Sequence, residues 1–141
     1  MYYGALALTV ASNVLYHVVQ KLMPPSVHPM LALIVAYLAA AVICALLLPV
    51  FPFQASLPDE MRRLNLASLG LAFAIVGLEA GFLIAYRAGG KITTAGLISN
   101  TTVAMLLVPV GWAVFRERPT PVNGLGILVC LMGLVLVNWG K

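Results

Sequence analysis

The chain has 141 residues, of which 62% are hydrophobic and only 9% are charged, and its mean hydropathy is +1.05. This composition excludes an ordinary soluble domain and is typical of an integral membrane protein. A spanning helix needs about 20 mostly apolar residues, so the length leaves room for four or five spans and almost no soluble domain. The net charge of +4 is scattered over short loops, which argues against a nucleic-acid-binding surface and favours contact with anionic lipid.

The first predicted helix covers about residues 3–22 and ends before the paired prolines Pro24 and Pro25. Its polar residues recur at helical spacing along one face, which carries Thr9, Asn13, Tyr16, His17 and Gln20. Because lipid offers no hydrogen-bond partners, we expect this face to point toward protein. The functional interpretation is the wall of a solute-binding cavity, and the alternative is hydrogen bonding between helices.

The second predicted helix, residues 29–48, is almost entirely apolar apart from Tyr37 and ends in the proline-rich turn 49–52. It is typical of a lipid-facing or scaffolding span. The hydrophilic stretch 58–63 that follows could form a short amphipathic segment on the membrane surface, but we expect a loop.

The third predicted helix, residues 66–86, carries Glu79 near its middle. A carboxylate at that depth costs roughly a few kcal/mol, so it normally faces a protein interior or a wet cavity. We therefore interpret Glu79 as a functional residue; the alternative is a protonated carboxyl that hydrogen-bonds a neighbouring helix. Gly77 and Gly81 would let another helix approach closely, and Tyr86 continues the face of Glu79. Tyr86 is thus its expected companion on the same helix.

The fourth predicted helix, residues 92–115, begins with polar residues. Thr93, Gly96 and Asn100 share a face and could present a hydroxyl, open backbone and an amide to a buried ligand. The alternative is that the hydroxyls bond back to their own helix. Pro109 is expected to kink this helix near its far end.

The fifth predicted helix covers residues 122–139, after the turn Arg116 to Pro119. Gly126, Cys130 and Gly133 lie at i, i+4 and i+7 and form a small-residue seam, which favours close packing between helices or between two chains. Cys44 lies in an apolar segment like Cys130, so we expect both to be packing residues, with a disulfide as the open alternative. No Cys/His spacing indicates a metal site.

Five spans would place the two termini on opposite sides of the membrane. The cationic residues then divide equally, with Arg62, Arg63, Arg116 and Arg118 on the face of the N-terminus and Lys21, Arg87, Lys91 and Lys141 on the other. Since orientation follows the cationic bias between loops, this tie predicts dual topology and an antiparallel homodimer around a midplane site. The alternative is one orientation set by features outside this count.

Four stretches carry a resemblance to a known family: ASNVLYHVVQKL, GFLIAYRAGGKITTAGLISN, FRERPTPVNGLG and GILVCLMGLVLVNW. Together with the five-span layout they resemble one EamA-like half of the drug/metabolite transporter superfamily, over nearly the whole chain. The resemblance implies a small-solute carrier that works by alternating access, in the inner membrane of a bacterium. Full-length members carry two inverted halves, so a single half is expected to dimerise.

Two groups of proteins within that superfamily indicate which chemistry to expect. The small multidrug resistance proteins couple transport to protons through a glutamate in helix one, where the register set by Lys21 places Asn13 in this chain. The sequence departs from that pattern, and Glu79 could take over the acidic role from helix three. It is also similar to flippase subunits that move sugar-modified undecaprenyl phosphate, and in that case Arg87 and Lys91 would contact phosphate or headgroups.

The sequence therefore predicts an all-α polytopic membrane protein with five transmembrane helices in a single domain, residues 1–141. The leading function is proton-coupled solute transport; the alternatives are a lipid-linked-sugar flippase and a non-transporting partner subunit. We expect neither an enzyme nor a cofactor, and no nucleotide-binding motif is present. The residues expected to bind solute or protons are Glu79, Asn13, His17, Tyr86, Asn100, Tyr16 and Thr93.

Overall fold

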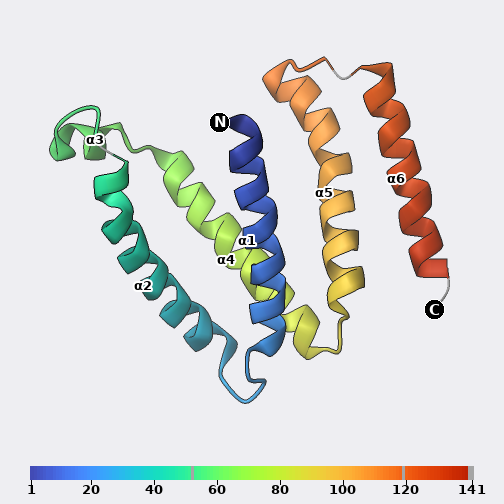
Figure 1. The fold of residues 1–141 in the computed structure, drawn as a ribbon, viewed down its shortest axis with the longest axis horizontal. Coiled ribbons are helices and arrows are strands. Elements are labelled where there is room, and N and C mark those ends of the chain that lie inside the picture. The colour runs from blue at the N-terminus through green and yellow to red at the C-terminus, as the bar shows by residue number, and fades with distance from the viewer. Residues whose placement is uncertain (52, 119, 140–141) are drawn as a thin grey trace. The chain divides into compact units, whose positions relative to one another are not determined.

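The computed structural model describes residues 1–51, 53–118 and 120–139, apart from the side chains of Leu134 and Asn138. Pro52, Pro119 and Lys141, which entered the predicted turns and the charge count, lie outside these residues. The described chain forms helices and no strand (Figure 1), which confirms the all-α class.

The five long helices begin and end within one residue of the predicted ranges, because they are mainly apolar runs and proline, glycine or charged residues lie near most of their ends. A short 3₁₀ turn, Leu48–Val50, extends the second helix. The helices are α1 (Tyr2–Leu22), α2 (Pro29–Leu47), α3 (Leu57–Arg63), α4 (Leu66–Arg87), α5 (Ile92–Phe115) and α6 (Pro121–Trp139).

The stretch between α2 and α4, which we expected to be a loop, forms the short helix α3 instead. Asp59 and Glu60 lie in its first turn and Arg62 and Arg63 in its last, an arrangement that complements the helix dipole. The Ser56 hydroxyl donates to the Asp59 carboxylate at 2.6 Å just before the helix. These local signals outweigh the shortness of the segment, so the expectation of a loop was wrong.

Three helical segments are long and apolar enough to cross a membrane within the described chain: Pro29–Val50, Leu66–Arg87 and Ile92–Phe115. Helix α1 has 21 residues, but its polar face makes it less apolar than these three. The apolar stretch of α6, Pro121–Val137, is shorter. The structure therefore supports a polytopic membrane protein, while the count of five spans stays a prediction.

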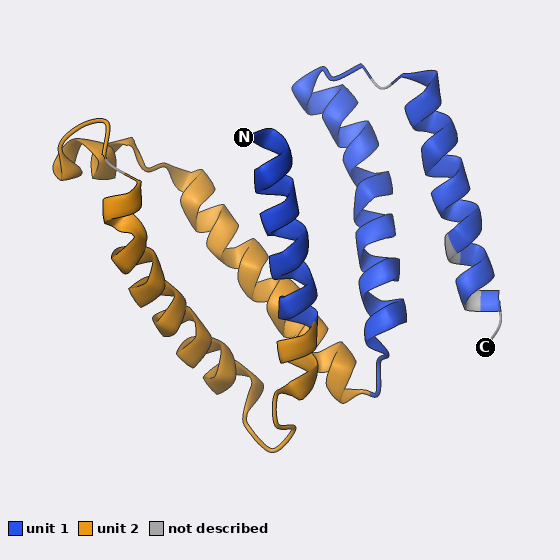
Figure 2. Ribbon diagram, viewed as in Figure 1, with its two compact units in different colours: residues 1–17, 89–141 blue, residues 18–88 orange. Residues whose placement is uncertain are grey.

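The chain divides into two compact units, residues 1–17 with 89–141 and residues 18–88, and the boundary falls inside α1 (Figure 2). In the unit 18–88, α2 packs against α4, and its buried apolar residues are Ala32 and Leu33 of α2 and Leu83 and Tyr86 of α4. In the other unit, α5 packs against α6, and the two helices run in opposite directions (Figure 1).

Candidate functional site

Glu79 is half-buried on α4, and its carboxyl interacts with Tyr37 of α2. The Tyr37 hydroxyl interacts electrostatically with the Glu79 carboxyl. The Tyr37 hydroxyl is buried, and no atom of the described residues meets the geometric criteria for a hydrogen bond with it. Helix α2 is thus more than the lipid-facing or scaffolding span that the sequence indicated. The available signal was that Tyr37 is the isolated polar residue of an apolar helix.

The backbone beside this carboxyl is also held by α1. The Gln20 side-chain amide donates to the Glu79 carbonyl oxygen at 3.3 Å, and the Gln20 side chain is only 6% exposed. The last turn of α1 therefore fixes the middle of α4, while α2 supplies a hydroxyl to the carboxyl.

Tyr86, the expected companion of Glu79, is buried on α4 about two helical turns after Glu79. The Lys21 ammonium donates to the Tyr86 carbonyl oxygen at 3.4 Å and lies 5.6 Å from the centre of its ring. The Phe82 ring stacks on Tyr86 with centroids 5.9 Å apart. Because these contacts involve Lys21 and Phe82, a pairing of Tyr86 with Glu79 stays a prediction.

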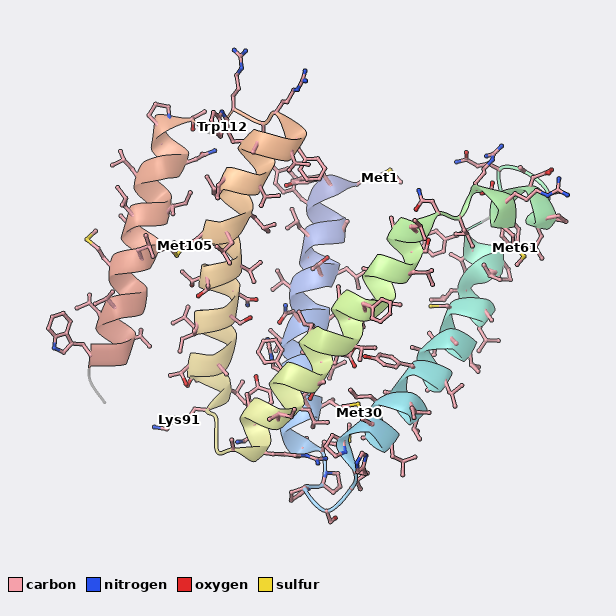
Figure 3. All side chains as sticks on the ribbon, turned by 180° about the vertical axis from the view of Figure 1, so that it is seen from behind. Met1, Met30, Met61, Lys91, Met105 and Trp112 are labelled. Carbon is pink, nitrogen blue, oxygen red and sulfur yellow. The ribbon has the colours of Figure 1, made fainter. Side chains whose placement is uncertain are left out.

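The two cations proposed as phosphate contacts differ in their surroundings. The Arg87 guanidinium Nη2 donates to the Pro24 carbonyl oxygen at 3.3 Å, which ties the end of α4 to the loop after α1. Lys91 is exposed immediately before α5, where Figure 3 shows it at the end of that helix opposite Trp112. Arg87 thus has a structural role already.

In the unit that contains residues 1–17, the polar face of α1 meets the start of α5 through His17. The imidazole Nε2 lies 3.4 Å from the position that a Cβ on Gly96 would occupy, and the Tyr16 ring packs edge-on against His17 at 5.2 Å. The open backbone at Gly96, which we expected to admit a ligand, is filled by His17. Asn13 and Thr93 are exposed.

A cavity of about 680 Å³ lies between α5 and α6. It brings Asn100, which the sequence predicted to bind solute, together with Gly126 and Cys130, which the sequence predicted to form a packing seam. Its charged and amide-bearing lining residues also include three that sequence reasoning did not assign to a site: Glu117, Arg118 and Asn123. These three residues lie around a turn between two apolar helices, and this position in the sequence could have identified them.

Glu117 is positioned by the end of α5. Arg116 adopts the left-handed conformation with φ 56°, and the Glu117 backbone N–H donates to the Gly111 carbonyl oxygen at 3.0 Å. The chain thereby folds back, and the Glu117 carboxylate Oε2 lies only 2.7 Å from where a Cβ on Gly111 would stand. The carboxylate can lie along this helix because Gly111 lacks a side chain.

The small-residue seam of α6 makes no close contact with another element of the described chain. No such atom lies within 4 Å of the Cβ positions of Gly126 and Gly133, and Cys130 and Cys44 are exposed free thiols. The close helix packing predicted for the two glycines of this seam is therefore not seen among the described residues, and packing against another chain stays a prediction.

The family model for the EamA-like transporter family matches residues 1–139. The chain belongs to the EamA-like transporter family. Comparison of this EamA-like protein with curated proteins and with solved structures gave no match. The family match and the three long apolar helices together make it an integral membrane protein of a transporter family.

Proposed function

We propose that this EamA-like protein carries a small cationic or zwitterionic solute by alternating access, and that Glu79 exchanges a proton for the solute. The observation that carries the proposal is that Glu79 lies inside a candidate span of a chain that belongs to a transporter family. Of the four acidic residues, Asp59 and Glu60 lie on α3 and Glu117 lies in the turn after α5. Glu79 alone lies inside a candidate span, where ionisable residues typically mark ion or proton pathways.

The surroundings of Glu79 support this role. A tyrosine hydroxyl can donate to an ionised carboxylate and accept from a protonated carboxyl, so Tyr37 can accompany both states. Gln20 holds the backbone at Glu79, and the carboxylate itself remains half-exposed. Further solute contacts are proposed from the predicted residues: Asn13, Tyr16, His17, Tyr86, Thr93 and Asn100.

The proton coupling can be tested in vesicles of purified protein that contain a pH-sensitive dye. A panel of amines and amino acids is added outside, and the change of internal pH is recorded. We expect solute-driven proton movement in the wild type and none in Glu79→Gln, because the amide cannot release a proton. Glu60→Gln removes a partly exposed carboxyl on α3, outside the candidate spans, and should behave as wild type. Normal coupling in Glu79→Gln would refute the role of Glu79.

We further propose that the transporter is an antiparallel homodimer of five-span chains in a bacterial inner membrane. The equal division of cations between the two faces supports dual topology. Gln54 and Ser26 are exposed in loops that five spans would place on opposite faces.

A single added cation should therefore bias insertion, with Gln54→Lys and Ser26→Lys driving opposite orientations. Each variant alone should transport poorly, and co-expression of the two should restore transport. Labelling of an introduced loop cysteine from either side of the membrane reports the orientation. A wild-type chain that labels from one side only would contradict the proposal.

A further inference from the structure

The cavity between α5 and α6 is an amphipathic groove, which we define by Asn100, Met105, Val108, Glu117, Arg118 and Ile127 among its lining residues. Its volume of about 680 Å³ is in the range of about 300–1,000 Å³ found for ligand sites. Its walls between the two helices are mainly apolar, and Figure 3 shows Met105 on the side of α5 that faces α6. The charged pair Glu117 and Arg118 closes one end.

The position of the groove along α5 indicates at which depth in a bilayer each part of the groove lies. Helix α5 is a candidate span that ends at Phe115, so the following turn lies at the level of the lipid headgroups. The walls formed by Met105 and Val108 then lie at the depth of the hydrocarbon chains. The groove thus offers charges at headgroup level and apolar surface below.

We propose that this groove binds a zwitterionic phospholipid, with one acyl chain between α5 and α6, the headgroup amine on Glu117 and the phosphate on Arg118. A carboxylate next to a guanidinium is the charge complement of a headgroup that carries both an ammonium and a phosphate. Guanidinium groups bind phosphate through paired hydrogen bonds. Within the described residues neither Glu117 nor Arg118 is engaged in an ion pair, so both charges remain available.

The backbone around Glu117 strengthens the case for a bound amine. The turn holds the carboxylate against Gly111 at the carboxyl end of α5, where the helix dipole is negative. A negative side chain is unfavourable there unless a cation lies beside it. Arg116 and Arg118 flank Glu117 in the sequence, and a headgroup ammonium would add a cation at the carboxylate itself.

The groove is also accessible from the bilayer. Leu107 on its wall is 58% exposed, and Asn100 and Cys130 are exposed as well. Arg118 additionally lines a smaller adjoining hollow of about 340 Å³ beside Trp112. A lipid can therefore enter sideways, with its phosphate reaching Arg118 from the membrane surface.

The test is native mass spectrometry of the full chain after incubation with mixed micelles of phosphatidylethanolamine or phosphatidylglycerol. The wild type should retain phosphatidylethanolamine in preference to phosphatidylglycerol, which lacks the amine. Glu117→Gln and Arg118→Gln change exposed side chains and should each lower retention of phosphatidylethanolamine about tenfold, as expected for one charge-assisted hydrogen bond. Equal retention of the two lipids by the wild type would overturn the proposal.

A matched pair of variants on α6 tests the acyl-chain part of the groove. Gly126 lines the groove and Gly133 is not among its lining residues, and a Cβ atom added at either meets no described atom of another element within 4 Å. Gly126→Leu should fill the groove and lower lipid retention about tenfold, whereas Gly133→Leu should retain lipid as the wild type does. Loss of the dimer in Gly126→Leu with unchanged lipid retention would instead assign the groove to a second copy of the chain and overturn the proposal.

The lipid site is independent of the proposed proton coupling. Glu79→Gln should retain phosphatidylethanolamine as the wild type does, because Glu79 does not line the groove. Loss of lipid retention in Glu79→Gln would contradict this independence and the assignment of the site to the groove.

Discussion

The two units of the chain use their polar side chains differently. In residues 18–88, the long donors Gln20, Lys21 and Arg87 all reach backbone carbonyl oxygens of other segments. In the hairpin of α5 and α6, the polar residues Asn100 and Glu117 line an open cavity instead. Since lipid satisfies no polar group, the first arrangement joins segments of the protein, and the second leaves polar groups for a ligand.

The start of α5 lies against α1 at His17, so the open character of that unit is limited to the rest of the α5–α6 hairpin. Gly96→Leu would force a side chain into the His17 ring, 3.4 Å from the Cβ position, and should cost about 3 kcal/mol of stability through overpacking. Gly70→Leu on α4, where no described neighbour lies within 4 Å, is the matched control and should be tolerated. Thermal unfolding in detergent measures both; equal stability of the two variants would show that α1 and α5 are not in contact at His17.

The buried centre of the unit 18–88 gives the next largest effect. Leu83 is 1% exposed, whereas Leu78 on the same helix is 52% exposed. Leu83→Ala should cost about 2 kcal/mol, the low end for a buried leucine, because lipid is as apolar as the core and only packing is lost. Leu78→Ala should cost much less in the same unfolding assay. Similar losses would mean that α4 is not packed on this face.

The hydrogen bond from Gln20 to the Glu79 carbonyl should contribute less. Gln20→Leu should cost about 0.6 kcal/mol, the mean for a side-chain hydrogen bond between membrane helices, while Gln54→Leu in an exposed loop should cost nothing measurable. The same unfolding assay in detergent compares the two variants. If Gln20→Leu were as stable as the wild type, the hydrogen bond from Gln20 would not contribute to holding α1 against α4.

The smallest effect on stability is expected at Gly111, where the functional effect should nevertheless be clear. A Cβ would stand 2.7 Å from the flexible end of Glu117, which can move, and alanine gains about 1 kcal/mol over glycine in a helix. Gly111→Ala should therefore fold as stably as the wild type but retain less phosphatidylethanolamine, because the carboxylate is displaced. Unchanged lipid retention would show that the position of Glu117 against α5 is irrelevant to the groove.

Local features of the sequence predicted the long helices well. Apolar runs interrupted by proline, glycine and charge determine where a helix can begin and end, and the resemblance to EamA-like proteins agrees with the family match. Helix α3 was missed although acidic residues at its start and basic residues at its end were visible.

Pairings between helices could not be predicted in the same way. Helical periodicity shows which residues share a face, but it does not show which faces meet. Glu79 was therefore recognised as unusual while its neighbour Tyr37 was not, and the open backbone at Gly96 was assigned to a ligand although His17 fills it. The charged turn at Glu117 was likewise visible, but the cavity that it closes arises only when α5 and α6 are placed side by side.

The most direct test of the proposed function is the release of protons on solute binding. Purified protein in weakly buffered detergent solution is titrated with amines and amino acids, and the wild type is compared with Glu79→Gln and with Glu60→Gln. We predict proton release in the wild type and in Glu60→Gln, and none in Glu79→Gln. Solute binding with the same proton release in Glu79→Gln would contradict the assignment of Glu79 as the coupling residue.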